Sequence, residues 1–155
     1  MNLTRLQATF VYSVCLILVV TASLKLLGAI NRNKALNQPD PVLSVRYYEL
    51  FLGAGVVETA VAAYCCTKVL RRANCLLILW LALNILAYRL ALGFHVPGAP
   101  PCPCLGAITD ILPISAPTIN VTMWVLLTYM LLGSLFCLLT SKWFKNAEQT
   151  ALAHG

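Results

Sequence analysis

The sequence predicts an all-α integral membrane protein, a bundle of four helices that cross a bilayer with both termini on the cytoplasmic side. The chain has 155 residues, of which 60% are hydrophobic and 10% are charged, and its mean hydropathy is +0.81. This composition is too apolar for a soluble domain, and the length suits one small unit. Four apolar stretches are each about 20 residues long, enough to cross a hydrocarbon core of about 30 Å as helices.

The expected spans cover most of the chain. The first stretch follows Arg5 as a signal peptide would, but its apolar run continues to Ile30 and exceeds a usual signal core, which favours a retained span. Residues 1–145 are expected to form one domain, and residues 146–155 a mobile cytoplasmic tail. The four spans run approximately over residues 8–30, 47–70, 74–95 and 121–140.

The orientation follows from the Lys and Arg residues in the short flanks. One side holds Arg32, Lys34 and Arg46, whereas the side of the termini holds six basic residues: Arg5, Lys68, Arg71, Arg72, Lys142 and Lys145. Such an excess marks the cytoplasmic side of a membrane protein. The net charge of +6 is therefore explained by orientation in a bilayer. The basic residues form no stripe, so we expect no nucleic-acid partner.

The third connection contains the segment "GFHVPGAPPCPCLG", residues 93–106, with Cys102 and Cys104 one residue apart. No Lys or Arg occurs between Phe94 and Val121, which places this segment on the outer side, where disulfides persist. Its prolines fix φ near about −65° and remove backbone donors, so the segment is expected to be stiff and to present both thiols. They are Pro97, Pro100, Pro101 and Pro103.

Three interpretations of the Cys-Pro-Cys segment remain open. A disulfide between residues i and i+2 departs from relaxed geometry and is readily reduced, which favours a redox pair. The cysteines could instead form a static clip. They could also, with His95, supply thiolate and imidazole ligands to copper or zinc, although a fourth ligand of the usual kind is lacking.

The other five cysteines lie within the spans or near their cytoplasmic ends, where a thiol usually acts as a small apolar residue. The vicinal pair Cys65 and Cys66, with Cys75 across the second turn, is a weaker candidate for a soft-metal site. Packing is the favoured interpretation for the five residues, which are Cys15, Cys65, Cys66, Cys75 and Cys137.

Polar and charged residues within the spans are the second functional signal. Lys25, Glu49 and Arg89 are expected in the outer half of the bilayer. Glu58 and Asn84 lie deeper, at similar depths on neighbouring spans, and are therefore candidate partners. An unpaired charge in hydrocarbon is costly, so these side chains are expected to face the bundle interior and pair there. They either fix the helix register or serve proton or redox traffic beneath the cysteine segment.

With these features the chain resembles the MauE branch of the DoxX-like membrane proteins. MauE proteins are the membrane proteins of methylamine utilisation clusters. The resemblance rests on four spans, on "SLKLLGAI" late in the first, on the acidic "YYELFLGAGVVETAVAA" in the second, and on "AYRLALG" and "CPCLG" before the fourth. The family's Cys-x-Cys-[Phe/Leu]-Gly motif with its upstream arginine matches at Arg89, Cys102, Cys104, Leu105 and Gly106.

The resemblance implies a bundle related in outline to membrane thiol oxidants of the DsbB and vitamin K epoxide reductase type. It also implies work beside a periplasmic thioredoxin-like partner and makes a quinone a candidate cofactor. This chain departs from the quinone-linked enzymes because it has no Cys-x-x-Cys and no second outer cysteine pair. We therefore expect a bacterial inner-membrane protein that exchanges disulfides through Cys102 and Cys104 and supports maturation of another protein. The alternative is an accessory subunit of a larger membrane complex, with the cysteines as a clip.

Overall fold

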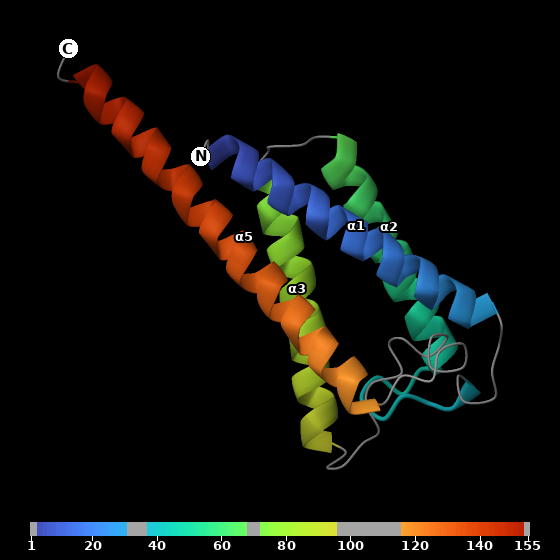
Figure 1. Ribbon diagram of the computed structural model, residues 1–155. Coiled ribbons are helices and arrows are strands. Elements are labelled where there is room, and N and C mark those ends of the chain that lie inside the picture. Colours follow the sequence, from blue (N-terminus) through green and yellow to red (C-terminus); the bar gives the residue numbers. More distant parts are fainter. Residues whose placement is uncertain (1–2, 31–36, 68–71, 96–115, 154–155) are drawn as a thin grey trace.

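The computed structural model describes residues 3–30, 37–67, 72–95 and 116–153. The described residues form four α-helices and no strand (Figure 1). All four helices contain a segment long and apolar enough to cross a membrane, so the predicted fold class is confirmed. The side on which the termini lie stays a prediction. The helices are α1 (Leu3–Ile30), α2 (Tyr47–Thr67), α3 (Arg72–His95) and α5 (Ala116–Ala153).

Prolines accompany two of the helix boundaries. Helix α3 ends at His95, two residues before Pro97, and the backbone before a proline disfavours the helical region. Helix α5 begins at Ala116, so Pro117 lies in its first turn, where the missing N–H has no intrahelical role. Elsewhere the spans contain long apolar runs without proline, which allows uninterrupted helices.

Helix α5 is longer than the predicted fourth span. Its 38 residues extend about 57 Å at 1.5 Å per residue, well beyond a hydrocarbon core of about 30 Å. The apolar segment is Pro117–Thr140, and the helix continues through Lys142 and Lys145 into residues 146–153. A mobile tail is expected from residue 146. The helix includes most of that segment, and its mobility stays a prediction.

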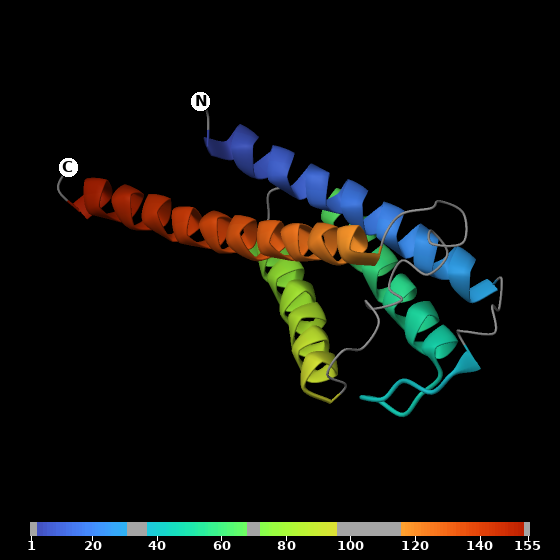
Figure 2. The same cartoon turned by 60° about the horizontal axis from the view of Figure 1, so that its bottom comes forward.

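The helices run alternately up and down and associate as two pairs. Helix α1 packs along α2, and α3 packs along α5, whereas contacts between α2 and α3 are sparse. Figure 1 shows α3 and α5 diverging from the α1–α2 pair, and Figure 2 shows this divergence mainly for α3, while α5 runs in nearly the same direction as α1. Helix α1 ends, α2 begins, α3 ends and α5 begins at the same end of the bundle, which we call the Ile30 end.

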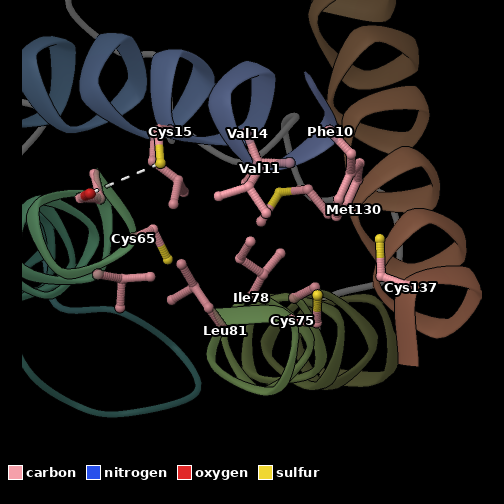
Figure 3. Close-up of a cluster of buried hydrophobic side chains, with 14 of the residues drawn as sticks. Phe10, Val11, Val14, Cys15, Cys65, Cys75, Ile78, Leu81, Met130 and Cys137 are labelled. Atoms are coloured by element: carbon pink, nitrogen blue, oxygen red, sulfur yellow. Dashed lines mark hydrogen bonds between the residues drawn. The ribbon is translucent and has the colours of Figure 1, made fainter. Parts of the chain in front are cut away.

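One cluster of buried apolar side chains joins α1, α2, α3 and α5 (Figure 3). Phe10 of α1 packs edge-on against Tyr129 of α5, with ring centroids 5.4 Å apart. A Cβ added at Gly133 would lie 2.0 Å from Cε2 of Phe10, so glycine allows this close approach of α5 to the ring. Hydrogen bonds extend the contact between α1 and α5, from Ser13 to Tyr129 at 2.6 Å and from Gln7 to Thr140 at 3.0 Å.

Four of the five cysteines expected to serve packing are buried in this cluster, and the fifth, Cys66, is exposed. Cys15 donates a weak hydrogen bond from its thiol to the carbonyl oxygen of Ala62, at 3.7 Å (Figure 3). The described residues contain no group of three or more His, Cys, Asp or Glu side chains placed to hold a metal ion. The four buried cysteines are Cys15, Cys65, Cys75 and Cys137.

The segment before α2 is fixed by Asp40, which is 1% exposed. Its Oδ1 accepts hydrogen bonds from the backbone N–H groups of Val42 and Leu43, both at 2.8 Å. Its Oδ2 accepts one from the hydroxyl of Tyr88 on α3. Ser44 has a φ of 57°, a left-handed conformation that the turn requires. The segment is thereby attached to α3 across the bundle.

Candidate functional site: a cavity between the helix pairs

The divergence of the two helix pairs leaves a cavity of about 670 Å³ between them. All four helices and the segment before α2 contribute to its walls. Most of the lining is apolar, with side chains such as Leu81, Leu127 and Met130. Six lining residues are polar or charged: Thr21, Lys25, Glu49, Glu58, Asn84 and Tyr88. All six lie within about three helical turns of the Ile30 end.

Lys25 of α1 and Glu58 of α2 form an ion pair within this wall. Both side chains are buried, with exposed fractions of 7% for Lys25 and 3% for Glu58. The ammonium donates to Oε1 of Glu58, and the hydroxyl of Thr21 donates to Oε2 at 3.1 Å. Both carboxylate oxygens therefore have a donor. This is the salt bridge found among the described residues.

The pairing follows from the direction in which helical side chains lean. Lys25 lies about 8 Å from the Ile30 end along its helix, and Glu58 about 17 Å, at 1.5 Å per residue. Side chains lean toward the N-terminus of their own helix. Helices α1 and α2 are antiparallel, so the Lys25 side chain leans away from the Ile30 end and that of Glu58 leans toward it. The two charged groups meet between their Cα levels.

Gly55 allows the two helices to approach at this level. A Cβ added there would lie 3.0 Å from Leu26 and 3.4 Å from the carbonyl oxygen of Ala22, both on α1. Gly53, two residues earlier, has nothing within 4 Å of such a Cβ. The small residues of the stretch 53–63, "GAGVVETAVAA", are expected from the sequence to allow close helix packing. Gly55 is the glycine of this stretch that faces α1.

Asn84 is not the partner of Glu58, although the two residues lie at similar depths. Its amide donates to the carbonyl oxygen of Trp80, one turn earlier on α3, at 2.7 Å. Helix α3 runs antiparallel to α2, so the Asn84 side chain leans away from the Ile30 end while that of Glu58 leans toward it. Because the two Cα atoms lie at equal depth and the side chains lean in opposite directions, the two polar groups lie at different depths.

Glu49 and Arg89 each find a partner other than an opposite charge. Glu49 is exposed and accepts a hydrogen bond at 3.0 Å from the hydroxyl of Tyr48. Arg89 donates to Oδ1 of Asn120 on α5 at 3.2 Å, and its guanidinium lies 5.3 Å from the ring centroid of Trp124. Such a cation–π contact stabilises the charge of the guanidinium. Its Nη1 is buried and has no hydrogen-bond partner among the residues that the structure describes.

The cysteine motif itself lies outside the described residues. It consists of Cys102, Cys104, Leu105 and Gly106. His95 is the last residue of α3, and Ala116 is the first of α5. The chain between them connects two helix ends at the Ile30 end of the bundle. The metal interpretation with His95, like the redox interpretation, stays a prediction.

Three features of the site are not predicted from the sequence. Thr21 lies four residues before Lys25, the spacing that places two side chains on one helical face, and this signal could have identified it. The contact of Asp40 with Tyr88 joins residues 48 positions apart, and no local pattern indicates it. The cavity arises from divergence of the helix pairs, which no local pattern encodes. No family model, curated protein or solved structure matches this chain.

Proposed function

We propose that this protein is a redox-associated protein of the bacterial inner membrane that exchanges disulfides with a periplasmic thioredoxin-like partner. Cys102 and Cys104 are the reacting residues, and the exchange supports maturation of another protein. The observation that carries the proposal is the Cys-Pro-Cys sequence in the connection between two apolar helices. The polar residues that line the cavity also lie toward this end of the bundle.

The exchange needs two thiol–disulfide steps. A thiolate of the partner attacks one sulfur of the Cys102–Cys104 disulfide, which breaks that bond, forms a mixed disulfide and releases the other cysteine as a thiolate. The partner's second thiolate then attacks the mixed disulfide. The partner leaves with its own disulfide, and the Cys102–Cys104 pair has gained two electrons. Reoxidation of the dithiol requires an acceptor, for which a quinone is the candidate.

A trapping experiment tests the proposal. With Cys104→Ala or Cys102→Ala, the remaining thiolate can attack the disulfide of the oxidised partner and form a mixed disulfide, but this chain then lacks the second cysteine that would release the partner as a dithiol. We therefore expect one of the two variants to accumulate a covalent adduct with a periplasmic protein. The adduct would be separated on a non-reducing gel and identified by mass spectrometry. Cys66→Ala, which alters an exposed cysteine near the other end of the bundle, is the matched control and should give no adduct. Loss of a membrane complex without any adduct would contradict the proposal and favour the accessory-subunit alternative.

A further inference from the structure

The cavity has the size and walls of a ligand site. Its volume of about 670 Å³ lies within the roughly 300–1,000 Å³ typical of small-molecule pockets. Apolar side chains from both helix pairs form most of the lining. A molecule that fills it must therefore present mainly apolar surface to these walls.

The polar groups of the cavity specify one part of that molecule. The Lys25 ammonium carries three N–H donors, and Oε1 of Glu58 is the acceptor found for it among the described residues. Lys25 is only 7% exposed and lines the cavity. A buried donor without an acceptor is costly. A carbonyl oxygen placed in the cavity beside Lys25 would supply the acceptor.

The charge balance excludes a charged head at this position. Lys25 and Glu58 neutralise each other, so a carboxylate or ammonium group beside them would add an unmatched charge at a depth where charges are expensive. A head with an uncharged carbonyl group avoids this cost and still accepts a hydrogen bond.

The exposure of lining residues on α2 and α3 indicates that the cavity opens sideways between these two helices. Val57 of α2 and Trp80 of α3 both line it and yet are 40% and 54% exposed. Gly53, which also lines it, has nothing within 4 Å of an added Cβ. An opening in the apolar flank of two membrane-length helices faces the lipid, so a ligand enters from the bilayer.

We propose that this cavity binds a membrane-soluble molecule with an apolar chain and an uncharged carbonyl-bearing head. The head accepts a hydrogen bond from Lys25, and the chain extends toward the opening between α2 and α3. A glycerol ester of the bilayer and a quinone share this chemistry. The inference does not depend on Cys102 and Cys104. The test below distinguishes failure of ligand binding from failure of the proposed thiol exchange.

The test uses a substitution that closes the opening of the cavity without disturbing the buried core. Gly53→Trp places a large side chain at the opening, where an added Cβ meets nothing. Gly93→Trp is the matched control, because Gly93 is also an exposed helical glycine with nothing within 4 Å of an added Cβ, but it does not line the cavity. The probe is a monoacylglycerol with a photoreactive diazirine in its chain, added to the purified full-length protein in phosphatidylcholine nanodiscs.

We expect the probe to label peptides of α2 and α3 that line the cavity, and Gly53→Trp to reduce this labelling at least about fivefold, while Gly93→Trp leaves it unchanged. The double variant Lys25→Met, Glu58→Leu should weaken probe binding by about fivefold to tenfold, as expected for loss of one hydrogen bond. Cys102→Ser with Cys104→Ser should label like the wild type, so failure of the thiol exchange leaves this result intact.

Competitors identify the source of the head group. Unlabelled monoacylglycerol and decylubiquinone should compete with the probe, and the stronger of the two indicates whether a lipid ester or a quinone is the natural class. Palmitate, which carries a carboxylate, should not compete. Equal competition by palmitate, or labelling that Gly53→Trp leaves unchanged, would overturn the proposal.

Discussion

Lys25→Met, with Glu58 left in place, is expected to lower the free energy of unfolding by about 3–5 kcal/mol, the usual cost of breaking a buried ion pair from one side. Glu58 is 3% exposed and, among its described partners, would keep the hydrogen bond from Thr21. Glu58→Leu should cost less. The Lys25 side chain is long and its Cα lies only about 8 Å from the Ile30 end, so its ammonium can extend to the interface.

The double variant Lys25→Met, Glu58→Leu distinguishes pairing from packing. Removing both charges leaves no unmatched group, so it should be markedly more stable than Lys25→Met alone. Glu49→Leu is the control, because it removes an exposed carboxylate from the same helix. Unfolding in detergent or bicelles measures all four variants. Single variants that are as stable as the wild type would mean that these charges are not paired in the folded protein.

Gly133→Ala is expected to destabilise the contact between α1 and α5 by about 1–3 kcal/mol, the typical cost of overpacking a core. The added Cβ would lie 2.0 Å from Cε2 of Phe10, and the ring is held against Tyr129. Neither the ring nor the helix backbone can yield cheaply. The measurement is again the free energy of unfolding.

The matched control is Gly93→Ala, at a helical glycine where nothing lies within 4 Å of the added Cβ. There the higher helix propensity of alanine should raise stability by up to about 1 kcal/mol. Combining Gly133→Ala with Phe10→Ala should cost less than the sum of the two separate changes, since the clash disappears with the ring. Strict additivity would show that Phe10 and Gly133 do not meet.

The four spans are predictable from the sequence because length and hydropathy determine them locally. The partner of Glu58 could not be predicted in this way. Counting residues from the helix ends gives the depth of each Cα, and on that basis Asn84 matches Glu58. The groups that interact lie up to several ångströms from their Cα atoms, in directions set by each helix's polarity. Including this lean would have indicated Lys25 as the partner. The side chains of Lys25 and Glu58 lean toward each other along the bundle axis.

The contacts of Glu49 and Arg89 among the described residues were not predictable for a different reason. An aromatic ring and two neutral polar side chains, Trp124, Asn120 and Tyr48, serve these two charges instead. Residue type alone does not reveal such partners, because they depend on the rotation of each helix against its neighbour. Helix rotation is set by packing details such as Gly55 against Leu26, which appear only in three dimensions.

Thiol titration of the purified protein tests the proposed exchange most directly. The Cys66→Ser variant, which lacks the exposed cysteine of α2, would be equilibrated in glutathione buffers of increasing oxidising strength, alkylated, and its modified thiols counted by mass and located by peptide mapping. We expect Cys102 and Cys104 to pass together from dithiol to disulfide in the folded protein, while the four buried cysteines stay unchanged. A pair that stays reduced in the most oxidising buffer, or stays oxidised until the protein unfolds, would contradict the proposal.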